Sequence, residues 1–356
     1  MERNGLKRLS ERRFKAVKGD VTFALMAKNE IAIIGEFLDH HRSIGATQFL
    51  TIDNGSDDGT LEFLLDQPDC VVYRTEDAFA DANFGMDWIN QLMREHGEGG
   101  WFAYLDCDEH LQFPGMDRRS VQDFAAALRA EGHDGVHAVM VDMYPAADFT
   151  EIDLAGRDRP LAEIMNYFDR DYVVRRRPHR PWRAGRRAPL QILGGPRCRL
   201  LSDLRREAGR GWRHAMFVGQ IDRFVHKLPA SALPLAFRLW PRLVPALQKT
   251  PLTFVGPQTR YLNSHDATNV AIAPTLLCLL HFKFCSELAV KDRATGIAEH
   301  HYRRGMEREQ LRLALLDWKA DTLLYEGSVE YRSHRDLEEA GLLGDQFADV
   351  LTQYNA

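Results

Sequence analysis

The part of the chain best suited to chemistry is the segment WFAYLDCDEH, residues 101–110. Residues 101–105 are apolar and rich in aromatic side chains, which is typical of a short buried strand. Three acids then follow within four positions: Asp106, Asp108 and Glu109. Clustered carboxylates repel one another and resist desolvation, so a cation is needed to make them favourable at a buried strand end. Because carboxylate oxygens suit Mg²⁺ or Mn²⁺, we expect Asp106 and Asp108 to hold such an ion; the alternative is a solvated acidic turn.

Two earlier strands are also predicted to end in polar residues. Residues 21–27 read as a strand, and the sequence KNE that follows contains Asn29 and Glu30. Residues 48–52 read as a second strand, which runs into Asp53 and the turn sequence DNGSDDGT. An acid in that position could accept hydrogen bonds from a base or ribose, although turns of this composition are often only loops.

The elements that must position these residues alternate along the chain. A third strand is predicted at residues 70–74, and amphipathic helices are predicted near residues 31–43, 83–95 and 120–130. This alternation predicts an α/β fold with a parallel sheet, in which ligands bind at the carboxyl ends of the strands. Neither G-x-G-x-x-G nor a P-loop is present, so a bound diphosphate would need a metal ion to neutralise it.

The combination of ALMAKNE, IDNGSDDGT and WFAYLDCDE resembles the family 2 glycosyltransferases, whose fold is called GT-A. The likeness covers residues 20–115, and Asn54 stands where this family usually has a second Asp. The resemblance implies a Rossmann-like, mostly parallel sheet flanked by helices. It also implies that Asp53, with Asn29 and Glu30 nearby, binds a nucleotide-sugar donor, expected to be a UDP-sugar. Asp106 and Asp108 would hold Mn²⁺ or Mg²⁺ on the diphosphate.

Motifs in the second half extend this resemblance to about residue 304. GGPRCRLL, KTPLTF and LLCLLHFKF resemble motifs of a bacterial subgroup of GT-A proteins and occur in the same order. By this resemblance His281 is a third metal ligand, with His265 as the alternative, and Lys283 contacts the diphosphate. The simpler interpretation of His281 is a histidine satisfied within the core.

An inverting transfer, which is usual in this family, needs a carboxylate that takes a proton from the acceptor hydroxyl. Asp142 is the preferred base because it lies near the end of a strand predicted at residues 135–144. Asp169 and Asp266 are the alternatives.

The predicted function is therefore a metal-dependent glycosyltransferase. By resemblance, its acceptor is a glycan or glycolipid in bacterial surface polysaccharide synthesis. One alternative is a sugar nucleotidyltransferase, although FALMAKNE lacks the expected Gly-rich phosphate loop. The other is a non-catalytic GT-A module that binds carbohydrate or a protein partner.

Composition restricts location and partners. The net charge of −5 over 356 residues argues against nucleic acid as a partner. Five cysteines without a C-x-x-C pair favour reduced thiols and a cytoplasmic protein. The N-terminal residues are basic without an apolar core, unlike a secretory signal, and no apolar run is long enough to span a membrane. The Arg-rich residues 175–187 are either a solvated loop or a contact with an anionic acceptor or the inner membrane face.

Four regions are expected: a basic arm at residues 1–19, a nucleotide-sugar half at 20–115, an acceptor half of the same domain at 116–285, and a helical C-terminal region at 286–356. Nothing in the sequence indicates an oligomeric state.

Overall fold

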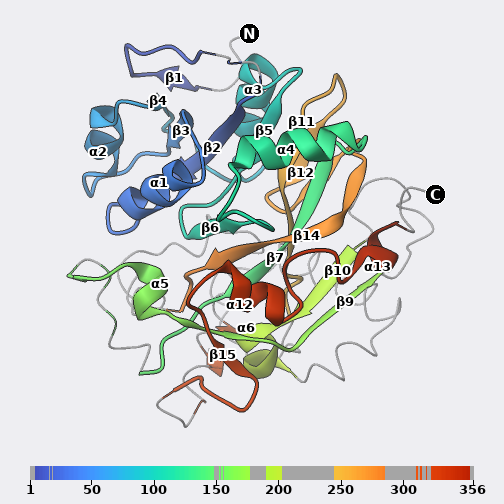
Figure 1. Ribbon diagram of the computed structural model, residues 1–356. Helices are drawn as coiled ribbons and strands as arrows, with labels where there is room; N and C mark the ends of the chain where they lie inside the picture. The colour runs from blue at the N-terminus through green and yellow to red at the C-terminus, as the bar shows by residue number, and fades with distance from the viewer. Residues whose placement is uncertain are drawn as a thin grey trace.

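A computed structural model gives the structure of the chain. It describes residues 5–15, 17, 19–147, 152, 154, 156–176, 190–202, 244–284, 310, 311, 313, 314, 318 and 322–352. Within these residues, the central sheet has nine strands in the order β1-β4-β3-β2-β5-β11-β7-β14-β6 (Figure 1). Its strands are β1 (Lys7–Arg8), β2 (Val21–Ala27), β3 (Phe49–Asp53), β4 (Cys70–Arg74), β5 (Trp101–Tyr104), β6 (Glu109–Gln112), β7 (Gly135–Asp142), β11 (Gln248–Phe254) and β14 (Ile272–His281).

The predicted α/β class is confirmed, and the sheet is mixed. Strand β2 runs parallel to β3 and β5, and β3 runs parallel to β4. Strand β11 comes from much later in the chain, lies between β5 and β7, and is antiparallel to both. Strand β14 is parallel to β7, so the carboxyl ends of β2, β3, β5, β7 and β14 all lie at one edge of the sheet.

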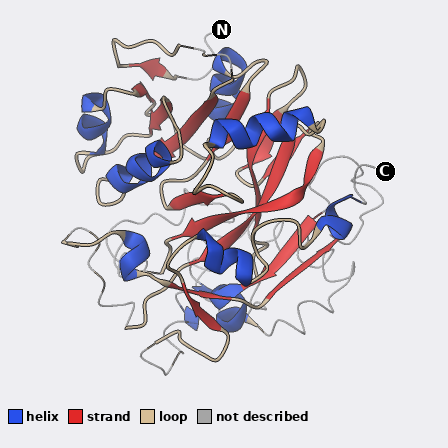
Figure 2. Ribbon diagram, in the orientation of Figure 1, coloured by secondary structure: helices blue, strands red, loops and turns tan. Residues whose placement is uncertain are grey.

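Helices cover both faces of the sheet (Figure 2). The main helices are α1 (Ile34–Ser43), α2 (Thr60–Asp66), α3 (Met86–His96) and α4 (Val121–Ala130). Alternate residues of β2 point to opposite faces, as the strand period requires. Phe23 and Leu25 pack in the cluster that includes α1, α2 and α4, while Ala24 packs with α3. These two apolar layers hold the strand ends in fixed positions.

The second half of the chain adds smaller elements beside the sheet. They are α5 (Leu161–Ile164), β8 (Tyr167–Asp169), β9 (Tyr172–Arg176), β10 (Leu190–Gly194), α6 (Gly195–Leu201), β12 (Arg260–Asn263), β13 (Asp266–Thr268), β15 (Ser328–Glu330), α12 (His334–Glu339) and α13 (Ala348–Thr352). Strands β9 and β10 pair in antiparallel orientation, and β15 pairs with β8 in the same way. The described C-terminal residues therefore include a strand as well as the helices that were predicted there.

Some predicted segments lie wholly or partly outside the described residues. Of the Arg-rich segment, residues 177–187 lie outside, as do most of the residues between 285 and 321. The described part of the basic arm includes β1, which pairs with β4 at the sheet edge. Among the residues described, no helix combines the length and apolar character needed to cross a membrane.

Candidate active site

The three acids after β5 meet a lysine at the carboxyl edge of the sheet. We call Asp106, Asp108 and Glu109 the acidic group. The ammonium of Lys249 lies 3.1 Å from Oδ2 of Asp106 and donates a 2.5 Å hydrogen bond to Oε2 of Glu109. That same Glu109 oxygen accepts the backbone N–H of Asp106 at 2.9 Å. Lys249 is fully buried, and its ammonium also lies over the ring of Tyr104. Its hydrogen bonds to Asp106 and Glu109 place its charge against the two carboxylates.

The register of β11 explains how a residue 140 positions away arrives there. Leu252 pairs with Ala103, which lies three residues before Asp106. Because β11 is antiparallel to β5, Lys249 comes level with the end of β5. The β11–β7 register shifts between Lys249 and Leu252, where the chain contains Pro251. Proline lacks a backbone N–H and is tolerated in a sheet mainly at such irregular places.

A second group of charges faces Asp108. Strand β14 places His281 opposite Asp142 on β7 and opposite Glu109 on β6. Nδ1 of His281 lies 2.6 Å from Oδ1 of Asp142, and Nε2 lies 3.3 Å from Oδ2 of Asp108. Backbone bonding reinforces this position, because Phe282 N–H donates to the Asp108 carbonyl at 3.0 Å. His281 therefore joins a buried aspartate to a partly exposed one.

The pKa values in this part of the protein follow from burial and charge. Burial acts to lower the pKa of His281, but the negative charges of Asp108 and Asp142 prevail and raise it to about 9. Burial acts to raise the pKa of Asp108, but His281 outweighs it and the pKa is well below the usual range. Burial opposes the charge of Lys249, yet Asp106 and Glu109 raise its pKa. Burial raises the pKa of Glu109, an effect that Lys249 opposes and the two aspartates reinforce.

Two of the three predicted bases are held by arginines of α6. Arg197 donates from Nε to Oδ2 of Asp142 at 2.6 Å and from Nη2 to Oδ1 at 2.8 Å. Arg199 makes the same kind of two-bond pair with Asp169, at 2.7 and 3.1 Å. Burial opposes the effect of Arg197, but Arg197 and His281 together bring the pKa of Asp142 down to about 2.

The third predicted base, Asp266, lies in the β12–β13 hairpin and is 3% exposed. Its Oδ2 accepts a hydrogen bond from the amide of Asn263 at 3.2 Å. Asp142 and Asp169 are likewise no more than 1% exposed. None of the three carboxylates faces solvent in this conformation, so an acceptor hydroxyl would reach them only after the surrounding side chains move.

The predicted nucleotide-binding residues near β2 and β3 form two loops bonded to each other. We call residues 28–31 and 53–60 the interlocked loops. The backbone N–H groups of Asn29, Glu30 and Ile31 donate to the side chains of Ser56, Thr60 and Asp58 at 2.9 to 3.1 Å. The Asn29 side chain accepts from Asp57 N–H at 2.9 Å in return.

Asp53, the first residue of the second loop, is fully buried. Its carboxylate accepts the N–H groups of Gly55 and Ser56, and Oδ2 lies 3.5 Å from the Arg74 guanidinium. Asn29 adopts a positive φ of 58°, a conformation that asparagine tolerates better than most residues. The polar side chains predicted to contact the donor therefore also shape the loops themselves.

Two further predicted residues lie beside the acidic group. Strand β14 ends at His281, so Lys283 lies just beyond the strand. Burial acts to raise the pKa of Asp108, while the charge of His281 and, to a smaller extent, that of Lys283 lower it. His265, the alternative metal ligand, bonds through Nδ1 to the Gln248 carbonyl at 3.0 Å. Burial, followed by the charge of Lys249, lowers the pKa of His265.

The acidic group has the ligand chemistry that a divalent cation prefers. The side chains of Asp106 and Asp108 are 43% and 32% exposed, and the buried Oε1 of Glu109 has no hydrogen-bond partner among the described residues. Three carboxylates face one ammonium, and the raised pKa of His281 keeps a proton on its ring; a cation bound at Nε2 would take the place of that proton. Within the described ranges, no set of three His, Cys, Asp or Glu side chains is already arranged around an ion position. Ligands would therefore have to close around an ion.

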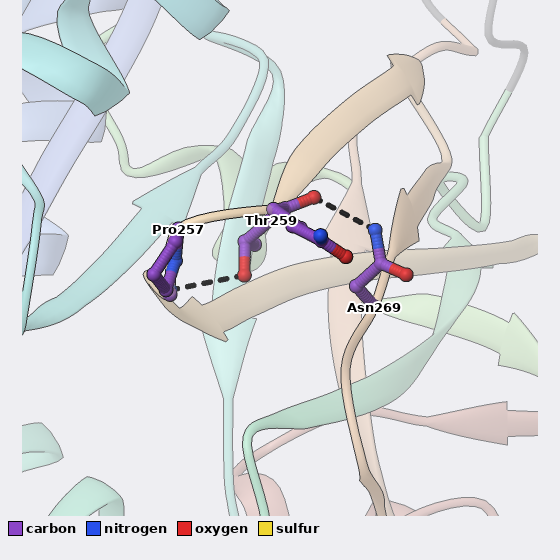
Figure 3. A pocket seen from close by; sticks show the side chains of 5 residues that line it. Pro257, Thr259 and Asn269 are labelled. Atoms are coloured by element: carbon purple, nitrogen blue, oxygen red, sulfur yellow. Dashed lines mark hydrogen bonds between the residues drawn. The ribbon is translucent and has the colours of Figure 1, made fainter.

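A pocket elsewhere on the surface is remote from these charges (Figure 3). It is lined by Gly256, Pro257, Gln258, Thr259 and Asn269, and it contains the hydrogen bond from the Asn269 amide to the Gln258 carbonyl. Because β11 ends at Phe254 opposite Trp101, the first residue of β5, this pocket lies at the amino ends of the parallel strands. It does not contribute to the acidic group.

Comparison with known proteins adds no assignment. No model of a known protein family matches the chain, and no curated protein matches it.

Sequence reasoning gave no role to Lys249 or Arg197. Both lie in motifs that were noticed, KTPL and GGPRCRL, but the spacing of a motif does not say which distant carboxylate it meets. A useful signal was available in composition: three clustered acids in a buried environment require counter-charges, and a lysine within an otherwise apolar motif is a natural candidate.

Proposed function

We propose that the protein is a metal-dependent glycosyltransferase of the GT-A type that uses a nucleotide-diphosphate sugar, with a UDP-sugar as the expected donor. The observation that carries the proposal is the arrangement at the end of β5. Asp106 and Asp108 are partly exposed there, and Nε2 of His281 lies 3.3 Å from Asp108. Two carboxylates and an imidazole nitrogen are a suitable ligand set for Mn²⁺ or Mg²⁺.

The residues have separate tasks in this proposal. A divalent cation bound there supplies positive charge that stabilises the departing nucleoside diphosphate. Lys249 holds Asp106 and Glu109 together against their mutual repulsion. Lys283 follows β14, its charge acts on Asp108, and we expect it to contact the same diphosphate. The interlocked loops lie at the ends of β2 and β3, next to β5, and are the expected nucleoside side of the site.

The acceptor is expected to be a glycan or glycolipid on the side of β7 and β14. We propose a positioning role for Asp142, because both of its oxygens are bonded to Arg197 and it is fully buried. A catalytic base needs to reach the hydroxyl proton of the acceptor. We therefore do not propose Asp142 as the catalytic base. The base in this proposal is a carboxylate that the acceptor hydroxyl can contact.

Calorimetric titration of the protein with UDP tests the proposal. We expect Mn²⁺ to strengthen UDP binding by at least about tenfold, because the ion would join the acidic group to the diphosphate. Uridine is the matched control: it lacks the diphosphate, so its binding should not depend on Mn²⁺. UDP binding that ignores the metal would favour the non-catalytic module, and undiminished UDP-sugar hydrolysis in EDTA would reject the metal-dependent mechanism.

A further inference from the structure

A chain of buried hydrogen bonds leads from α6 to the acidic group. Arg197 is 3% exposed and bonds both oxygens of Asp142, which is itself fully buried. Asp142 in turn bonds Nδ1 of His281 at 2.6 Å, and the opposite ring nitrogen faces Asp108 at 3.3 Å. The orientation of the imidazole therefore depends on a carboxylate whose own orientation depends on Arg197.

The start of α6 is built so that Arg197 can reach this place. Gly194 and Gly195 both have positive φ values, 151° and 67°. A Cβ on Gly195 would lie 2.9 Å from the Tyr172 hydroxyl, and one on Gly194 would lie 2.5 Å from the Asp171 carbonyl. Only glycine permits this close approach. The first turn of α6 therefore packs directly against β9, and Arg197 comes within bonding distance of β7.

We infer that Arg197 is a positioning residue for metal binding: through Asp142 it holds His281 with Nε2 directed toward Asp108. The inference rests on the proposed function, because it assigns Nε2 of His281 to the metal. A histidine that donates its other ring N–H to a carboxylate keeps one tautomer and one ring orientation, and loss of such a partner weakens metal binding 10- to 100-fold. The two-pronged guanidinium matters because it fixes both oxygens of Asp142 at once.

Arg199 is a matched control on the same helix. It lies two residues further on and makes the same kind of two-bond pair with a buried aspartate, Asp169. Its pair, however, leads away from His281: Asp169 accepts from the Tyr144 hydroxyl, and Arg199 also donates to the Leu323 carbonyl. Lysine at either position keeps the positive charge but cannot donate two parallel hydrogen bonds to a carboxylate as a guanidinium does.

The experiment compares Arg197→Lys with Arg199→Lys by Mn²⁺ titration, with electron paramagnetic resonance to count free Mn²⁺, and by thermal unfolding. We expect both variants to unfold at lower temperature, whereas only Arg197→Lys weakens Mn²⁺ binding, by about tenfold or more. With His281→Gln already present, Arg197→Lys should have no further effect on Mn²⁺ affinity. If Arg197→Lys does not fold, Asp142→Asn interrupts the same chain and predicts the same loss.

The outcomes separate the inference from the proposed function. A wild-type protein that does not bind Mn²⁺ contradicts the proposed function and removes the basis of the inference. Mn²⁺ binding that is normal in wild type and equally strong in Arg197→Lys overturns the inference alone. An equal loss in Arg197→Lys and Arg199→Lys also overturns it, because that result indicates general destabilisation instead of positioning.

Discussion

Two polar regions at the same edge of the sheet use their carboxylates in different ways. In the interlocked loops, the Asp53 carboxylate accepts backbone N–H groups from its own turn, and Asn29 bonds the backbone of Asp57. In the acidic group, Asp106 faces the ammonium of Lys249 and Asp108 faces the imidazole of His281. Backbone donors cannot leave without unfolding the turn, whereas a side-chain cation can shift when another cation arrives.

This difference separates residues that build the site from residues that can bind within it. Asp53 is fully buried, while Asp106 and Asp108 keep 43% and 32% of their side chains exposed. Both regions match the same family resemblance at the level of sequence. We therefore expect substitutions in the interlocked loops to act mainly on stability, and substitutions of Asp106 and Asp108 to act mainly on metal binding.

The largest effect is expected from Asp108→Asn. The amide keeps the size of the side chain and removes the charge that would bind a divalent ion, so Mn²⁺ affinity and UDP-sugar hydrolysis should fall by at least about 100-fold. The free energy of unfolding should decrease by about 1 to 2 kcal/mol, because the buried imidazole of His281 loses one of its two carboxylate partners and keeps Asp142. Titration with Mn²⁺ and urea denaturation measure the two quantities.

The converse result is expected from Asp53→Asn. The amide oxygen can still accept both N–H groups in the place of Oδ2, but the amide NH₂ cannot accept the Ser56 N–H as Oδ1 does, and the loss of charge weakens the contact with Arg74. The free energy of unfolding should decrease by about 2 kcal/mol, while Mn²⁺ affinity stays within about twofold of wild type. A variant as stable as wild type, or one that loses Mn²⁺ binding at full stability, would break the comparison between the two regions.

A smaller effect concerns acid stability and two histidines of α1. Burial lowers the pKa of His40 to about 4, and burial followed by the charge of His40 lowers the pKa of His41 well below its usual value. Both ring nitrogens of His41 are engaged, with the Phe37 carbonyl at 2.7 Å and the Leu111 N–H at 3.4 Å. These histidines are neutral in the folded protein, unlike His281.

The sign of the pH dependence follows from these lowered values. Between about pH 6.5 and pH 4 the unfolded chain binds more protons than the folded one, so stability decreases as the pH falls. For each such histidine the free energy of unfolding decreases by about 0.8 kcal/mol from pH 8 to pH 6. His41→Gln should reduce the measured difference in unfolding free energy by that amount. A variant with the same pH dependence as wild type would show that His41 does not titrate in this way.

The elements that depend on local patterns were predictable from the sequence. Residues 70–74 are β4, and the helix predicted near residues 120–130 is α4, where Ser120 and Asp123 form a capping box. The strand ends at Asn29, Asp53 and Asp106 lie at one edge because parallel strands share their direction. An apolar run followed by turn residues contains enough information for each of these.

Contacts between distant segments were not predictable in the same way. The sheet is mostly parallel, as expected, but the sequence did not show that β11 enters between β5 and β7 in the opposite direction and carries Lys249 to the acidic group. The pair between Arg197 and Asp142 depends on where α6 packs. That position depends on the close approach that Gly194 and Gly195 permit at the start of the helix. Periodicity describes one segment at a time, so it cannot identify such partners.

Diffraction at the manganese absorption edge, from crystals soaked with UDP and Mn²⁺, tests the central claim most directly. We predict an anomalous peak in contact with the carboxylates of Asp106 and Asp108 and with Nε2 of His281, and UDP phosphate oxygens on its open side. A peak at another place, with Asp106 still bonded to Lys249 and Asp108 still bonded to His281, would contradict the account.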